Sequence, residues 1–239
     1  MCERWSVVGV VTERDEEWLR WMVRWKGVTA KQIERWFVGD LAAGLKVVER
    51  RLRVWRELEL VEGQRFMADT GSVYWVTGEG MKFLGVEGTV SKPSAGQLRH
   101  DLAVTDCATW LRATTGARMV TEREVRRMEP PRSQARRFAV TPVEGTGRVI
   151  LYPDLLTRSA TGEIFSHEVE LAPKAGPRLR ALMLSNARAR HLSATVYYAP
   201  EATRKRVQQC ADEVNQRMRL DGVADKISVR GWEWEREGA

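Results

Sequence analysis

Three carboxylates stand close together in the second half of the sequence. Asp154 follows a proline in "YPDLLTR", and Glu168 and Glu170 lie two residues apart in "FSHEVELAPK". We predict strands over residues 148–158 and 163–172 that are joined by a turn at "SATG". Alternate residues of a strand share a face, so Glu168 and Glu170 lie together, with Asp154 opposite or diagonal to Glu168. The three acids are therefore expected to converge, either as a solvated surface, as metal ligands or as a catalytic group.

Such a cluster needs compensation for its charge. Two unit charges ~5 Å apart at an effective dielectric constant of ~20 interact by about 3 kcal/mol. A cation, an arginine or a raised pKa must therefore accompany the three carboxylates. Lys174, Arg178 and Arg180 follow closely in the sequence and could provide part of this compensation.

The elements around this hairpin predict an α/β layer with helices on a mixed sheet. Residues 89–97 are rich in Gly, Ser and Pro and form a predicted linker, so the second domain would span 98–239. Residues 117–128 combine strand and helix patterns. The other predicted elements are a helix over 98–116, a helix over 177–190, a strand over 192–200, a helix over 201–220 and an edge strand over 225–235.

The first third of the chain predicts three helices, a hairpin and a further helix. Helices are expected over 12–27, 28–38 and from 41 to about 61, where Gly63 would end the third. Strands over 63–68 and 72–77 flank a "DTG" turn, and a short helix follows over 77–85. This order is typical of a winged helix-turn-helix, which we assign to residues 1–88. The fold class is therefore α/β, or α+β overall.

One face of the predicted third helix is basic, with Glu49 as the exception. Leu45, Val48, Leu52 and Trp55 recur at helical spacing and are expected to point inward. A helix with a basic outer face can enter the major groove, where its arginines meet phosphates or guanine edges. Winged helices also serve as protein-docking modules, and each of these side chains could simply be solvated. The candidate DNA-binding residues are Lys46, Arg50, Arg53 and Arg56 on the helix and Arg65 on the wing.

The overall composition favours a polyanionic partner. The formal net charge is +7 and the pI is about 9.6, which suits nucleic acid first and an anionic membrane second. No apolar run approaches the roughly 20 residues of a membrane span, and the N-terminus does not have the pattern of a signal peptide. The three cysteines are widely spaced and suit a reducing compartment, so we expect a cytoplasmic protein without membrane partners.

The carboxylate hairpin resembles the nuclease family with the "PD…(D/E)-x-K" signature. Pro153–Asp154 and Glu168 match its two acids, while Glu170 stands where its lysine belongs. The resemblance implies that Asp154 and Glu168 hold Mg²⁺ and that a lysine positions or activates the attacking water. It therefore implies a catalytic group of Asp154, Glu168, Glu170 and Lys174, with Lys174 as a displaced lysine. Because Glu170 replaces the expected cation, we predict that cleavage has been lost.

Nearly the whole chain is similar to the replication-relaxation family of plasmids and other mobile elements. The similar pieces are the winged helix, "LRHDLAVTDCATWL", "YPDLLTR", "FSHEVEL" and the "TVYYAP" strand. The resemblance implies a winged helix followed by a restriction-endonuclease-like domain that binds double-stranded DNA in replication, relaxation, transfer or regulation. A homodimer and a replication or transfer protein are further expected partners. The alternatives are a metal-dependent endonuclease or nickase using Asp154 and Glu168, with Mg²⁺ as cofactor, and a winged-helix docking module.

Overall fold

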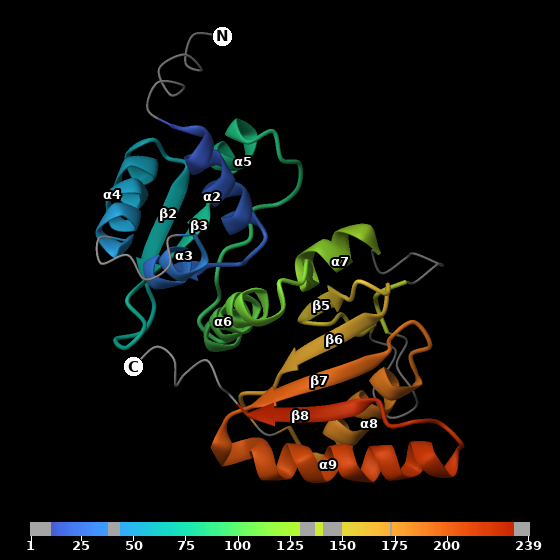
Figure 1. Ribbon diagram of the computed structural model, residues 1–239. Helices are drawn as coiled ribbons and strands as arrows, with labels where there is room; N and C mark the ends of the chain where they lie inside the picture. Colours follow the sequence, from blue (N-terminus) through green and yellow to red (C-terminus); the bar gives the residue numbers. More distant parts are fainter. Residues whose placement is uncertain (1–10, 38–43, 130–136, 141–149, 173, 232–239) are drawn as a thin grey trace. The chain divides into compact units, whose positions relative to one another are not determined.

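The computed structural model describes residues 11–37, 44–129, 137–140, 150–172 and 174–231. The chain divides into two compact units, Met1–Thr109 and Trp110–Ala239 (Figure 1). Helices and a mixed sheet make up these units, which confirms the predicted α/β class. The outermost residues of the predicted domains, 1–10 and 232–239, lie outside the described residues.

The N-terminal unit has the element order of a winged helix. Its two-residue strand β1 joins the hairpin to form an antiparallel sheet of order β1-β3-β2. This agrees with the predicted sequence of three helices, a hairpin and a helix. The elements are α2 (Glu13–Val23), β1 (Val28–Thr29), α3 (Ala30–Phe37), α4 (Gly44–Glu57), β2 (Val61–Arg65), β3 (Ser72–Val76) and α5 (Gly78–Phe83).

Tryptophans fill much of the core between the helices of this unit. Trp18 stacks on Phe37 with ring centroids 5.2 Å apart and meets Trp55 edge-on at 6.2 Å. Trp21 lies 5.2 Å from Trp36. These pairs join α2 to both later helices, and large aromatic rings dominate the burial of apolar surface in small cores. One face of α2 is therefore buried by aromatic packing.

The predicted end of α4 at Gly63 is wrong, because the helix ends at Glu57. Glu59 adopts a left-handed conformation with φ 58°, and the Leu60 N–H then donates to the Trp55 carbonyl at 2.9 Å. A glutamate thus occupies a position that usually carries glycine. Gly63 instead lies within β2, where a Cβ atom would come 2.5 Å from the ring of Tyr74. The glycine signal marks close packing in the hairpin rather than the end of the helix.

The boundary between the compact units falls inside α6 (Leu98–Thr115), beyond the predicted linker over 89–97. Leu98 and Leu102 pack with Val73 of the hairpin. Gln32 of α3 donates to the Leu102 carbonyl at 2.8 Å. The first half of α6 therefore belongs to the N-terminal unit, because its apolar side chains complete that core.

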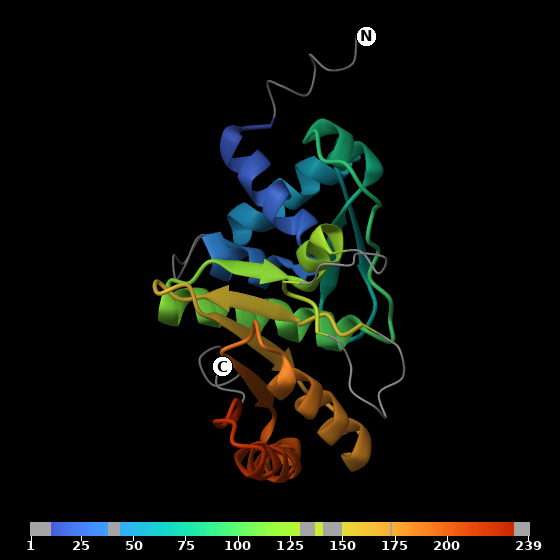
Figure 2. The ribbon, with the colours of Figure 1, turned by 90° about the vertical axis from the view of Figure 1, so that its right-hand side faces the viewer.

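The second unit is a mixed sheet of order β4-β5-β6-β7-β8 with helices against it. Strands β4, β5 and β6 are antiparallel, whereas β6, β7 and β8 are parallel. Figures 1 and 2 show α8 and α9 next to each other against β7 and β8, where their apolar side chains form one core. The elements are β4 (Met119–Thr121), α7 (Glu122–Met128), β5 (Leu155–Arg158), β6 (Ile164–Val169), α8 (Gly176–Arg188), β7 (Ala194–Ala199), α9 (Glu201–Leu220) and β8 (Ile227–Gly231).

This architecture confirms the predicted mixed sheet flanked by helices. Residues 117–128 resolve into strand β4 followed by α7, as their mixed pattern indicated. Strand β8 lies at the sheet edge, as predicted, although residues beyond 231 lie outside the described part of the chain. Of the predicted strand over 148–158, residues 148 and 149 lie outside the described part of the chain, and the regular strand β5 begins at Leu155. Among the described helices, none is both long and apolar enough to cross a membrane.

Candidate functional site

The hairpin β5–β6 brings the predicted carboxylates together at one end of the sheet. Leu155 pairs with His167, so the next pair outward is Asp154 with Glu168, as the sequence predicted. Asp154 Oδ2 accepts the backbone N–H of Val169 at 2.8 Å. This hydrogen bond fixes the Asp154 carboxylate beside the strand that carries the other two acids.

Glu168 is a half-buried carboxyl whose pKa is raised well above its usual range. Burial is the largest cause, followed by repulsion from Asp154, while Glu170 adds a smaller repulsion. Two groups act in the opposite direction: the Ser166 hydroxyl, which donates to Glu168 Oε1 at 3.0 Å, and the charge of Lys174. Glu168 therefore holds a proton more readily than an exposed glutamate does.

Glu170 is buried, with 4% of its surface exposed, and it forms an ion pair with Lys174. The nuclease resemblance places a lysine at position 170, which is Glu170 in this chain. A lysine, Lys174, is present four residues later and pairs with that glutamate. Of the other bases expected to compensate the cluster, Arg180 pairs with Glu213 of α9 at 3.0 Å. The cluster is compensated by one lysine and one raised pKa, in agreement with the expectation from the sequence.

Two residues of this site were not predicted from the sequence. Tyr197 of β7 is paired with Glu168 across the sheet, and its hydroxyl accepts the Asn186 side-chain N–H at 2.9 Å. Burial and the neighbouring Glu168 raise the pKa of Tyr197 well above its usual range. The signal available in the sequence was a tyrosine inside the apolar strand "TVYYAP", but its neighbour depended on the parallel pairing of β6 with β7.

Asp154 and Glu168 are the carboxylates of this cluster that could hold a cation. Among the described residues, no group of three or more His, Cys, Asp or Glu side chains is placed to hold a metal ion. Mg²⁺ is usually bound through one or two protein carboxylates together with water and phosphate oxygens. Asp154 and Glu168 can supply two such carboxylates, whereas Glu170 is engaged by Lys174.

The outer face of α4 carries the predicted basic residues. Lys46, Arg50, Arg53 and Arg56 are all exposed. Within the part of the chain that the structure describes, these four side chains make no ion pair or hydrogen bond. Their charges are therefore directed to solvent and available to a partner.

Arg51, on the same helix, has a different role. It donates from Nε to Asp15 Oδ1 at 2.8 Å and from Nη2 to Asp15 Oδ2 at 2.6 Å. Asp15 is 1% exposed and also caps the start of α2 through Thr12. Arg51 thus joins α4 to α2 within the core, which separates it from the exposed basic residues beside it.

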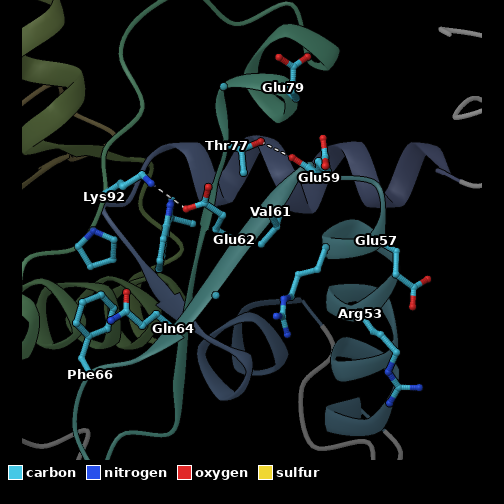
Figure 3. A pocket seen from close by; sticks show the side chains of 15 residues that line it. Arg53, Glu57, Glu59, Val61, Glu62, Gln64, Phe66, Thr77, Glu79 and Lys92 are labelled. Atoms are coloured by element: carbon cyan, nitrogen blue, oxygen red, sulfur yellow. Dashed lines mark hydrogen bonds and ion pairs between the residues drawn. The ribbon is translucent and has the colours of Figure 1, made fainter.

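A groove of about 1090 Å³ lies between the C-terminal half of α4 and the β2–β3 hairpin. Figure 3 shows Arg53 and Glu57 on the helix, and Glu62 paired with Lys92 on the hairpin side, with Nζ and Oε2 3.0 Å apart. Its charged lining residues are Arg53, Arg56, Lys92, Glu57, Glu59, Glu62 and Glu79. The groove is therefore not uniformly basic, and its acids gather toward the C-terminal end of α4 and the base of the hairpin.

The predicted wing residue Arg65 ends β2 and is exposed. Its Nη2 atom donates to the Ala68 carbonyl in the hairpin turn at 2.6 Å. This contact leaves the rest of the guanidinium at the surface. The structure thus places Arg65 on the same unit as the basic residues of α4, but on the hairpin.

Comparison with protein-family models, with curated proteins and with solved structures gives no match to this chain. Its function must therefore be inferred from the geometry of the two candidate sites and from the sequence resemblances.

Proposed function

We propose that the N-terminal unit binds duplex DNA, with α4 in the major groove. The observation that carries this proposal is the exposed row of Lys46, Arg50 and Arg53, which have no ion-pair partner among the described residues. Their spacing of four and three residues puts them on one side of the helix. Lysine and arginine in such a row can neutralise phosphates, and arginine can also form paired hydrogen bonds to guanine.

The distribution of charge suggests which part of α4 meets the DNA. The basic row begins in the first turn of α4, whereas Glu57 and Glu59 lie at its C-terminal end. Carboxylates repel phosphates, so the N-terminal half of α4, in which Glu49 is the one acid, would lie against the duplex. Recognition helices of helix-turn-helix proteins contact base edges through their N-terminal residues, which agrees with this orientation. Arg65 on the hairpin would contact the backbone beside the groove.

Binding across a salt series tests this proposal. A labelled duplex of random sequence is titrated with the wild type and with Lys46→Ala/Arg50→Ala/Arg53→Ala. Each lost phosphate contact lowers the slope of log K against log salt by about 0.9, so the slope should fall by about 3 units at most. The matched control is Lys205→Ala/Arg206→Ala/Arg217→Ala, which removes three exposed charges from α9.

Equal affinity and slope for the wild type and the α4 variant would refute the proposal. If duplex binding is absent even at low salt, the phosphate-contact model is also refuted. In that case the alternative is a protein-docking role for α4, which would be supported if a purified partner bound less tightly to the α4 variant than to the α9 control.

A second candidate function is metal-dependent DNA cleavage at the carboxylate cluster. The observation that favours it is Lys174, which pairs with Glu170 and also lowers the pKa of Glu168. A lysine thus lies near the two acids even though the expected position carries Glu170. Asp154 and Glu168 would hold Mg²⁺, which when bound would polarise the scissile phosphate and activate water. Lys174 would orient that water, while Tyr197 and Asn186 would fix the position of Glu168.

Nicking of supercoiled plasmid in Mg²⁺ or Mn²⁺ tests the second candidate. The wild type is compared with Asp154→Ala and Glu168→Ala, and Glu163→Ala is the control because Glu163 lies exposed in the turn before β6. Cleavage that both site variants abolish and the control retains would support the enzyme. No cleavage by the wild type, or cleavage that survives both substitutions, would refute it and leave DNA binding as the function.

The sequence resemblance gives the biological setting of the proposal. Similarity to the replication-relaxation family would make this protein a DNA-binding component of a mobile element, active in replication, relaxation, transfer or their regulation. A homodimer or a complex with a replication or transfer protein would then provide a second DNA half-site or a catalytic partner.

A further inference from the structure

An apolar side chain interrupts the basic surface of α4. Val47 is 36% exposed. Among the described residues, the other exposed large apolar side chains are Met128 and Leu220. Both of these lie in the second unit. Among the described residues of the N-terminal unit, Val47 is therefore the only large apolar side chain that is exposed.

Helix stability does not explain a valine at this position. Branching at Cβ restricts the side chain in a helix, so lysine, glutamate or alanine would favour the helix more. Core packing explains Val48, which is fully buried, but not its exposed neighbour Val47. Val54, one seven-residue repeat later, is half-buried and lies on the same side of α4. Val47 and Val54 thus lie two turns apart on the flank of the basic row, with Arg51 between them.

The surroundings of Val47 suggest the chemistry of its partner. Lys46 precedes it, Arg50 lies one helical turn further on, and both are exposed cations without partners among the described residues. A surface that joins an apolar contact to these positive charges fits a polyanion that offers an apolar group. In the major groove of DNA, thymine presents its 5-methyl group, and small apolar side chains contact it.

We infer that Val47 reads a thymine by packing against its methyl group, and so helps to determine the DNA sequence preference of this protein. The inference rests on the proposed binding of duplex DNA. Val47 is the fourth residue of α4, within the N-terminal part of a recognition helix that contacts base edges. Lys46 and Arg50 would hold the helix against the backbone or neighbouring guanines, and Val47 would add discrimination at one base pair.

Replacement of thymine by uracil tests the inference, because it removes only the methyl group. Preferred duplexes are first selected from a random pool with the wild-type full-length protein. Each thymine of the selected site is then replaced in turn by uracil, and affinities are measured for the wild type and Val47→Ala. The loss of one buried methyl group should weaken wild-type binding roughly four-fold at one position. Val47→Ala should bind the thymine and uracil duplexes equally well at that position.

Met128→Ala is the matched control, since it shortens an exposed apolar side chain in the other unit. It should keep the wild-type preference for thymine. Val47→Ala should have a thermal midpoint at or above that of the wild type, because alanine favours the helix.

The outcomes separate the inference from the proposed function. If Val47→Ala keeps the full preference for thymine, the inference is overturned while DNA binding stands. The same holds if the wild type binds duplexes in a salt-dependent way but selects no preferred site. If the wild type binds no duplex at low salt, both the proposed function and the inference fail.

Discussion

The outer face of α4 and the end of the β5–β6 hairpin use charge in opposite ways. On α4, Lys46, Arg50 and Arg53 are exposed, and they have no ion-pair partners within the described residues. On the hairpin, Glu170 is buried and paired with Lys174, and Glu168 has a raised pKa. The first group has no compensating charge among the described residues, whereas the second has most of its compensation inside the protein.

This difference teaches that residue type alone does not reveal the role of a charged side chain. Exposed cations contribute little to stability and can be committed to a ligand, since water already solvates them. A buried charge must be paired or neutralised to remain in a folded protein, so part of its energy is used by the fold. Four substitutions test this difference between exposed and compensated charges.

The largest loss of stability is expected for Arg51, which pairs with Asp15 although it lies on the same helix as the exposed basic residues. Arg51→Ala leaves the Asp15 carboxylate buried without its paired partner, which should lower the free energy of unfolding by about 4 kcal/mol. Arg50→Ala, one residue away and exposed, should change it by less than about 0.5 kcal/mol. Denaturant unfolding measures both. Equal losses for the two variants would show that exposure does not separate structural from available arginines on this helix.

Buried histidine His167 should make the sheet sensitive to acid. Burial, and to a smaller extent Arg230, lowers its pKa to about 4 from 6.5. The neutral ring bonds Thr157 Oγ1 at 2.8 Å and the Tyr198 hydroxyl at 3.1 Å. Because the unfolded chain binds this proton more readily, the stability contribution is complete above pH 6.5. It is lost as the pH falls toward 4, by about 3 kcal/mol in total.

The difference in unfolding free energy between the wild type and His167→Gln isolates this dependence from that of other groups. It should change by about 3 kcal/mol across that pH range. His191→Gln is the control, because His191 is half-buried and burial is again the main cause of its lowered pKa. Its dependence should be weaker. A flat difference for His167→Gln would show that the pKa of the ring is the same in the folded and the unfolded protein.

The Lys174–Glu170 pair tests whether compensation inside the second unit is needed for folding. Lys174→Ala leaves Glu170 buried and unpaired, which should cost about 2 kcal/mol, less than a fully buried pair because Lys174 is partly exposed. The double variant Lys174→Ala/Glu170→Gln should recover much of this loss in chemical unfolding. A double variant as unstable as Lys174→Ala would contradict the role of Lys174 as the counter-charge of Glu170.

The smallest expected effect concerns Glu59, an exposed charge at the end of α4. Its φ of 58° is a conformation that glycine adopts without strain, so Glu59→Gly should raise the free energy of unfolding by about 1 kcal/mol. The matched reverse change is Gly71→Ala, where φ is 69° and a Cβ atom meets no neighbour within 4 Å. This variant should lose about 1 kcal/mol in thermal or chemical unfolding. A loss of stability in Glu59→Gly would show that the Glu59 side chain makes a contact worth more than its strain.

Much of the fold and of both candidate sites could be predicted because the patterns are local. Helical spacing predicted the buried side of α4 and hence its exposed basic row. The alternation of "FSHEVE" and the position of the turn predicted the register that pairs Asp154 with Glu168. The interpretations of these residues as DNA-binding or metal-binding stay predictions until binding and cleavage are measured.

Local patterns were enough to predict the α/β class, the order of the elements and which charged residues share a face, because helix and strand periods are set by the backbone. The folded structure was needed to show that Tyr197 lies beside Glu168 and that Arg51 pairs with Asp15. It also decided that α6 begins in the N-terminal unit and that α4 ends at a left-handed glutamate rather than at Gly63. These features depend on contacts between residues far apart in the chain, whose packing and hydrogen bonds override local propensity.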